Sequence, residues 1–170
     1  GMIHNMEYTG VPLRLLLEEA GYDPAGKWIF VEGHDASSNG RSIPLEKALD
    51  DVLVAVKANG EALRKEHGYP VRLVVPGWEG NLWVKWLRRI EVLEAAVESR
   101  EETSKYTEPV KGGVSRQFSL VMDARSIITY PSYPDSVEKG WIEIQGIAWS
   151  GRGRIAAVEV STDDGRSWHR

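Results

Sequence analysis

The sequence of 170 residues contains no cysteine. This absence excludes disulfide bonds, a thiolate nucleophile and zinc sites with sulfur ligands within the chain. It does not fix the redox compartment. The histidines His4, His34 and His169 are isolated and lack the spacing of metal ligands, so the sequence predicts no metal site of its own.

An excess of positive charge is also lacking, because 21 lysines and arginines face 25 aspartates and glutamates, for a net charge of −4. No general basic field is available for a nucleic acid or an anionic membrane, so we expect neither partner. No apolar run approaches the roughly 18 residues of a membrane span. The opening GMIHNMEYTG lacks the basic and apolar regions of a signal peptide. Any anion site must therefore be local.

The composition is that of a folded globular protein, with 42% hydrophobic and 27% charged residues. Apolar periodicity and turn signals predict helices and strands in the first part of the chain. Residues 34–42 are polar and rich in turn formers, which indicates a loop. The expected elements are helices over 11–21 and 43–51, strands over 28–33, 71–77 and 84–94, and a strand, Asn-Gly turn and return over 52–63.

The composition of the sequence changes after residue 117. Residues 95–116 are charged and poor in large apolar side chains, which is typical of an extended, solvated connection. Farther on, 141–150 and 154–165 alternate apolar and polar residues between glycine-rich turns, as in a β-sandwich. We therefore expect an α+β domain over 1–112 and the first strands of a sandwich over 113–170, where three or four strands are too few for a complete one.

Cations and large aromatics gather in the stretch HGYPVRLVVPGWEGNLWVKWLRRI at 67–90. His67 precedes a predicted strand that Arg72 begins, and Lys85 lies beyond the following loop. Together these three donors would suit a phosphate, since arginine offers a planar fork and lysine a point charge. The same pattern also fits separate surface cations and one hydrogen-bonded histidine.

Two further places carry candidate binding groups. Asp35 and Ser42 flank the polar loop after the strand at 28–33, where ligands often bind, although both could simply stabilise a turn. Tyr106 is the one aromatic residue of the charged connection, and its phenol could donate a hydrogen bond to an oxyanion or merely anchor the segment. Motifs of nucleotide binding, zinc proteolysis and serine hydrolysis are absent from the sequence.

The stretch HGYPVRLVVPGWEGNLWVKWLRRIEV resembles the signature of the sulfite oxidase family of molybdenum enzymes. That signature runs His-Gly-aromatic-Pro-x-Arg, an apolar strand, Pro-Gly, and then Val-Lys-Trp-Leu. The stretch EGHDASSNGRSIPLEKALDD is similar to the family's Glu-Gly-x-Asp loop, which is followed by Ser-Ile-Pro-Leu. IQGIAWSGRGRIAAVEVSTDDGRSW resembles the opening of its immunoglobulin-like dimerisation domain. Within the family, the sequence most resembles the Sox sulfur dehydrogenase branch.

The resemblance implies a molybdopterin-binding α+β domain and an oxidation of sulfite or a related sulfur compound by oxygen-atom transfer. Electrons would pass to a c-type cytochrome, and the protein would be a periplasmic homodimer. Tyr106 falls where the family is expected to place its tyrosine beside the molybdenum. The positions implied to contact the pterin or its phosphate are Asp35, Ser42, His67, Arg72, Trp83, Val84 and Lys85.

The resemblance also contains a departure, because the family's molybdenum is held by a cysteine thiolate upstream of the Asp35 loop. A chain without cysteine cannot supply that ligand, and other side chains would change the electronics of the metal. We therefore expect a part of a molybdenum oxidoreductase that is inactive alone, with the cofactor bound in the intact parent. A non-enzymatic remnant that dimerises or binds a partner is the alternative, and a pterin- or phosphate-binding protein without a metal is a third possibility.

Overall fold

A computed structural model describes residues 5–170, and it divides into two compact units after Leu120. The division falls later than the expected boundary after residue 112. Phe118 packs its ring against Trp28 at a centroid distance of 5.5 Å, and the Leu120 carbonyl accepts a hydrogen bond from Glu79 N. The segment that leads up to Leu120 therefore belongs to the first unit.

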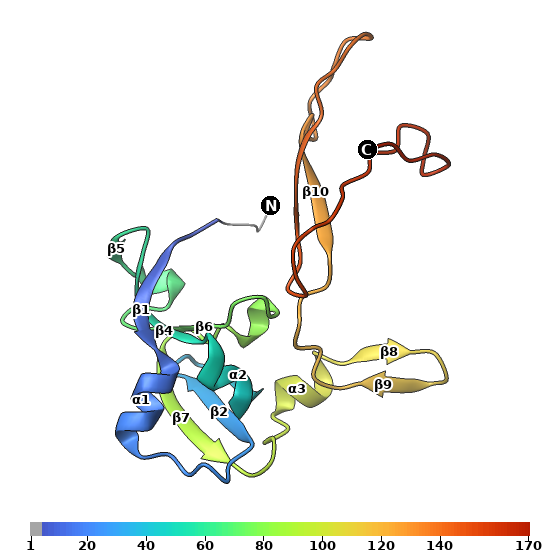
Figure 1. The fold of residues 1–170 in the computed structure, drawn as a ribbon. Helices are drawn as coiled ribbons and strands as arrows, with labels where there is room; N and C mark the ends of the chain where they lie inside the picture. The colour runs from blue at the N-terminus through green and yellow to red at the C-terminus, as the bar shows by residue number, and fades with distance from the viewer. Residues whose placement is uncertain (1–4) are drawn as a thin grey trace. The chain divides into compact units, whose positions relative to one another are not determined.

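The first unit contains two larger antiparallel sheets with helices beside them, and the two-stranded hairpin of β8 (Glu108–Val110) and β9 (Val114–Arg116) (Figure 1). One sheet has the order β1-β4-β5, with β6 also paired to β4, and the other has the order β3-β2-β7. The strands are β1 (Tyr8–Pro12), β2 (Trp28–Gly33), β3 (Gly40–Pro44), β4 (Leu53–Ala58), β5 (Glu61–Ala62), β6 (Arg72–Val74) and β7 (Leu87–Leu93). The helices are α1 (Leu13–Ala20), α2 (Leu45–Asp50) and α3 (Arg100–Ser104), with short 3₁₀ turns η1 (Lys65–His67) and η2 (Gly80–Leu82).

The core of this unit follows from the two periodicities of the sequence. Alternate residues of β2 are buried, so that Ile29 and Val31 are fully covered. In α1 the buried residues are Leu13 and Leu17, one turn apart, and Gly21 ends the helix in the left-handed conformation. The predicted α+β class and the predicted elements of the first part are confirmed, with element ends shifted by a few residues.

Two predictions about loops were wrong. The polar segment 34–42 was expected to be all loop, but β3 begins at Gly40 and pairs with β2. The connection at 95–116 was expected to be extended, but it contains α3 and the hairpin of β8 (Glu108–Val110) and β9 (Val114–Arg116). The cause in the second case is a capping box, in which Ser99 and Glu102 satisfy each other's backbone N–H groups at the start of α3.

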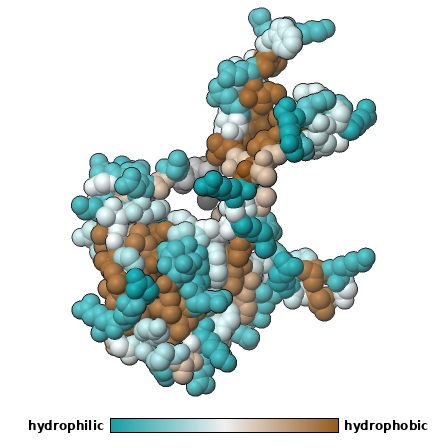
Figure 2. Space-filling view, in the orientation of Figure 1, coloured by the Kyte–Doolittle hydropathy of each residue, from teal (hydrophilic) through white to brown (hydrophobic). Residues whose placement is uncertain are grey.

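The second unit is an antiparallel hairpin with an irregular tail (Figure 1). Strands β10 (Arg125–Tyr130) and β11 (Gln145–Trp149) pair from Arg125 opposite Trp149. The expected strand over 154–165 is not regular, and only the isolated bridge between Val160 and His169 is present there. Apolar residues line the hairpin and group on the visible face of the first unit, as Figure 2 shows.

None of the helices among residues 5–170 is long and apolar enough to cross a membrane.

Candidate functional site

The predicted cations come together because two segments of the first unit run side by side. Leu73 N donates to the Val84 carbonyl at 2.8 Å, and Leu87 N donates to the Val71 carbonyl at 3.0 Å. These bonds set β6 and the segment 83–87 next to each other. We call His67, Arg72 and Lys85 the cation cradle.

Gly68 permits this close approach. Its φ is +105°, and a Cβ at this position would lie 2.9 Å from Lys85 Cβ and 3.2 Å from Arg72 Cβ. Glycine adopts such a backbone conformation without a steric penalty and leaves the space empty. The turn that carries His67 therefore lies directly against both other members of the cradle.

The guanidinium of Arg72 is held by backbone oxygens and by aromatic rings. It donates to the carbonyls of His67 at 3.1 Å and Trp83 at 3.3 Å. The rings of Tyr8 and Trp83 lie 5.5 and 5.9 Å from its central carbon. Burial lowers the pKa of Arg72, and the electrostatic interaction with Tyr8 opposes that shift. Its Nε is buried and has no hydrogen-bond partner among the described residues.

Lys85 is fixed in a similar way on the other side of the cradle. Its ammonium donates to the Glu66 carbonyl at 2.8 Å and lies 4.4 Å from the ring centroid of Trp86. The neighbouring Val84 is buried, and Trp83 Nε1 donates to the Trp78 carbonyl at 3.2 Å. The predicted residues from 83 to 85 are thus part of the cradle or of its immediate support.

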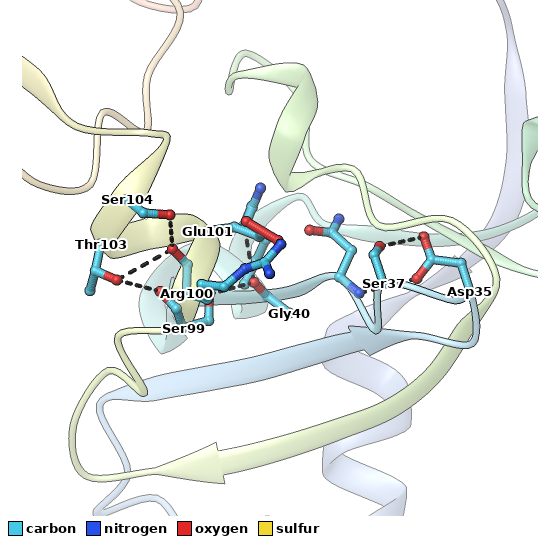
Figure 3. A network of polar contacts seen from close by, with 10 residues as sticks. Asp35, Ser37, Gly40, Ser99, Arg100, Glu101, Thr103 and Ser104 are labelled. Carbon is cyan, nitrogen blue, oxygen red and sulfur yellow. Dashed lines mark hydrogen bonds and ion pairs between the residues drawn. The ribbon is translucent and has the colours of Figure 1, made fainter.

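The loop that carries Asp35 reaches the same segment. His34 N donates to the Trp86 carbonyl at 2.8 Å, and a Cβ on Gly33 would lie 2.7 Å from the Lys85 carbonyl oxygen. The carboxylate of Asp35 itself accepts hydrogen bonds from Ser37 Oγ at 3.1 Å and Asn39 N at 3.2 Å, the first of which is drawn in Figure 3. Asp35 therefore stabilises its own turn, and this turn is joined to the cradle through the backbone.

Ser42 lies apart from the cations. Its backbone N–H and its hydroxyl both donate to the buried carboxylate of Glu102, and its Oγ accepts from Val97 N at 3.0 Å. Nearby, Ser99 Oγ donates to the Gly40 carbonyl at 2.9 Å, in the network of Figure 3. These contacts tie β3 to α3, and the expected contact of Ser42 with the pterin stays a prediction.

Tyr106 also lies apart from the cations. Its ring faces the guanidinium of Arg41, and both residues border a cavity of about 10 Å³, large enough for one water molecule. No contact joins Tyr106 to the cradle among the described residues. Its expected place beside the molybdenum stays a prediction.

The electrostatic character of the cradle is its main chemical feature. Within the part of the chain that the structure describes, the side chains of Arg72 and Lys85 bond to carbonyl oxygens and face aromatic rings, and neither bonds to a carboxylate. Their charges are consequently left for an external anion. The described residues contain no group of three His, Cys, Asp or Glu side chains that could hold a metal ion.

Four residues around these sites were not predicted from the sequence. Trp86 lies in the Val-Lys-Trp-Leu part of the family signature, and Glu102 follows Ser99 at the spacing of a capping box. The sequence therefore contained a signal for both residues. Tyr8 and the buried Arg41 had none, because their contacts come from segments distant in the sequence.

Comparison with known proteins agrees with the fold. Residues 1–103 match the family model of the oxidoreductase molybdopterin binding domain, and residues 116–170 match the Mo-co oxidoreductase dimerisation domain. The chain belongs to the sulfite oxidase family of molybdenum oxidoreductases, whose cofactor is molybdopterin, and the predicted resemblance is confirmed.

Among solved structures, the sulfane dehydrogenase SoxCD from Paracoccus pantotrophus is 62% identical, with a TM-score of 0.93. The match covers 99% of this chain and 44% of that chain. Mitochondrial sulfite oxidase of Drosophila melanogaster is 36% identical over 99% of this chain and 33% of its own length. Sulfite oxidase of Gallus gallus is 35% identical over 99% and 40%. The chain therefore spans less than half the length of each of these relatives.

Proposed function

We propose that the first unit forms the wall of a molybdopterin pocket that binds the phosphate of the pterin. The observation that carries this proposal is Arg72 Nε, a buried donor without a partner among the described residues, in the cradle that also contains Lys85 and His67. An unsatisfied buried donor costs about 1–3 kcal/mol, which an acceptor oxygen of a ligand would recover.

The donor set fits the phosphate end of the cofactor. Arg72 and Lys85 keep N–H groups beyond those bonded to carbonyls, and His67 lies on the turn that Gly68 packs against them. Trp83 and Val84 would border the pterin, while the turn of Asp35 would close one side of the pocket. Since the chain has no cysteine, it offers no thiolate to bind the metal. A thiolate ligand must therefore come from outside these 170 residues.

The reaction that we propose for the intact enzyme is the oxidation of sulfite, another sulfur oxyanion or sulfane sulfur. When bound, the cofactor supplies oxygen-atom transfer, in which sulfite and water give sulfate, two protons and two electrons. A c-type cytochrome would accept these electrons one at a time, in the periplasm. The support for this substrate class is the sulfane dehydrogenase and sulfite oxidase names of the similar proteins. The part of this chain is to hold and orient the cofactor.

We also propose that the second unit contributes to a homodimer. It matches a dimerisation domain, and its hairpin leaves Ile128 59% and Ile147 47% exposed. Light scattering of the purified chain should show a dimer, and Ile128→Lys should shift it toward the monomer. A monomer at every concentration would argue against this role.

The direct test is to express the chain together with the biosynthetic enzymes of the cofactor and to measure bound pterin and molybdenum. We expect pterin near one per chain with little metal, since the thiolate is missing. Arg72→Met should lower the pterin content at least tenfold. Arg88→Met is the matched control, because Arg88 is an exposed arginine that pairs with Glu32 on the strand outside the cradle.

Two results would redirect the proposal. A wild-type chain that retains no pterin but still dimerises would favour the non-enzymatic interaction module. Molybdenum at one per chain would contradict the need for an external thiolate.

A further inference from the structure

Trp86 lies where the separate segments of the cation cradle meet. Its indole Nε1 donates to the Lys65 carbonyl at 2.9 Å, which attaches it to the turn η1 that carries His67. The face of its ring lies 4.4 Å from the Lys85 ammonium. Its backbone carbonyl accepts the hydrogen bond from His34 N in the Asp35 loop at 2.8 Å. One residue thus contacts the structures around three of the predicted cofactor-binding residues.

The backbone of Trp86 is in an unusual conformation. Its φ is +50°, in the left-handed region that non-glycine residues with bulky side chains rarely occupy. Such a conformation persists only where the surrounding contacts compensate for its cost. The three contacts of Trp86 are the described interactions that provide this compensation.

The side chain of Lys85 requires a contact that holds its ammonium group in place. A lysine side chain is long and flexible, and fixing its ammonium in one place is opposed by the loss of rotamer freedom. The ring of Trp86 and the Glu66 carbonyl hold the ammonium from two directions, and the indole N–H holds the segment that contains that carbonyl.

We propose that Trp86 is a positioning residue, which holds Lys85 and the η1 turn in place as an anion-binding cradle before any ligand arrives. This inference rests on the proposed anion site and assigns the residue that organises it. Trp86 itself need not touch the ligand. Its effect on binding comes through the prior ordering of Lys85 and His67, which removes a cost that the ligand would otherwise meet.

The geometry can be tested in the full chain by NMR after ¹³C methylation of the lysine amines, a modification that keeps their charge. The Lys85 methyl signal, identified by its loss in Lys85→Arg, should be shifted upfield by the Trp86 ring. The shift should largely persist in Trp86→Phe, which keeps a ring, and vanish in Trp86→Leu. An unshifted Lys85 signal in the wild-type protein would overturn the proposal.

Binding is then followed by titrating inorganic phosphate while recording the Lys85 methyl and His67 ring signals. Trp86→Leu should weaken phosphate binding about tenfold, from the loss of the cation–π contact and one hydrogen bond together. Trp86→Phe should lie between this variant and the wild type. Trp28→Leu is the matched control, because Trp28 packs on Phe118 and lies at the opposite end of β2 from Gly33. Equal phosphate affinity in wild type and Trp86→Leu would overturn the proposal.

The two proposals fail in different ways. One outcome is that the chain never retains pterin, while its phosphate binding depends on Trp86. That outcome would contradict the proposed function and leave the role of Trp86 intact. Pterin retention that is the same in wild type and Trp86→Leu would contradict the role of Trp86 alone. A leucine variant that unfolds is recognised by circular dichroism, and the phenylalanine variant then decides the outcome.

Discussion

The guanidinium carbon of Arg41 lies 4.5 Å from the centroid of the Tyr106 ring, and Arg41 is only 2% exposed. Burial lowers the pKa of Arg41, while electrostatic interactions with Tyr106, Glu102 and Glu101 oppose the shift. The guanidinium also donates to the carbonyls of Asn81 at 3.2 Å and Gly40 at 3.0 Å. Tyr106 therefore covers a buried cation in the first unit.

This relationship predicts the effect of changing Tyr106. Tyr106→Leu should lower the free energy of unfolding by about 1 kcal/mol, the usual size of a partly desolvated cation–π contact. Tyr106→Phe keeps the ring face and should cost less, as measured by urea denaturation. If both variants are equally destabilised, the hydroxyl rather than the ring supports Arg41.

Glu102 provides a second prediction, because its carboxylate is buried and accepts hydrogen bonds from Ser42 N, Ser42 Oγ and Ser99 N. Glu102→Ala leaves these donors without a partner and should lower the free energy of unfolding by about 2–3 kcal/mol. Glu61→Ala, at an exposed strand residue, is the control and should change it by less than about 0.5 kcal/mol. Similar losses in the two variants would show that the buried network adds nothing to stability.

Gly68 and Gly60 form a matched pair for testing the packing of the cradle. Both have positive φ, +105° and +80°, but a Cβ would contact Lys85 and Arg72 at Gly68 and nothing within 4 Å at Gly60. Gly60→Ala should lower the free energy of unfolding by about 1–2 kcal/mol through its backbone conformation alone. Gly68→Ala should lose a further 1–3 kcal/mol, roughly, from overpacking. Equal losses in thermal or urea unfolding would mean that the turn moves away from Lys85 without cost.

In the second unit, pH should act on the turn around Asp163. Hydrogen bonds from the side chain and backbone of Ser167 and from Ser161 lower the pKa of Asp163 from 3.8 to about 2. Because the folded pKa is below the unfolded one, the stabilisation is complete above about pH 4 and is lost as the pH falls toward 2.

This loss should appear as a change in the NMR signal of the Trp168 indole N–H between those pH values, a signal that can be assigned separately among the seven tryptophans of the chain. Asp163→Asn should remove that transition and leave the Trp168 signal nearly independent of pH in this range. A transition of the same size in the variant would assign it to another carboxyl group.

The parts of the fold that could be predicted are those that depend on local sequence patterns. Ile29 and Val31 alternate with less buried residues along β2, and Gly21 ends α1, so strand and helix could be read directly. The start of β3 was not predictable, because Gly40 and Arg41 look like loop residues. Their place in a strand depends on pairing with Glu32 and Val31 across the sheet.

The candidate site was predictable to a similar extent. His67, Arg72 and Lys85 were recognised as a group, and the structure brings them together. The expected roles of Ser42 and Tyr106 stay predictions, and the structure adds the partners that the sequence did not indicate, Glu102 and Arg41. Side-chain direction and long-range contacts decide such cases, and neither leaves a signal in residue type or spacing.

The close approach of Gly33 and Gly68 to Lys85 has a consequence for how the protein folds. The contact of Gly33 with Lys85 joins residues 52 positions apart and that of Gly68 with Lys85 joins residues 17 positions apart, so each closes a longer loop than the Asn-Gly turn between β4 and β5, at a greater cost in entropy. The cradle should accordingly be among the last features to form, after the local hairpin of β4 and β5. Anion binding should therefore report that the β3-β2-β7 sheet and the sheet that contains β4 and β6 have both assembled.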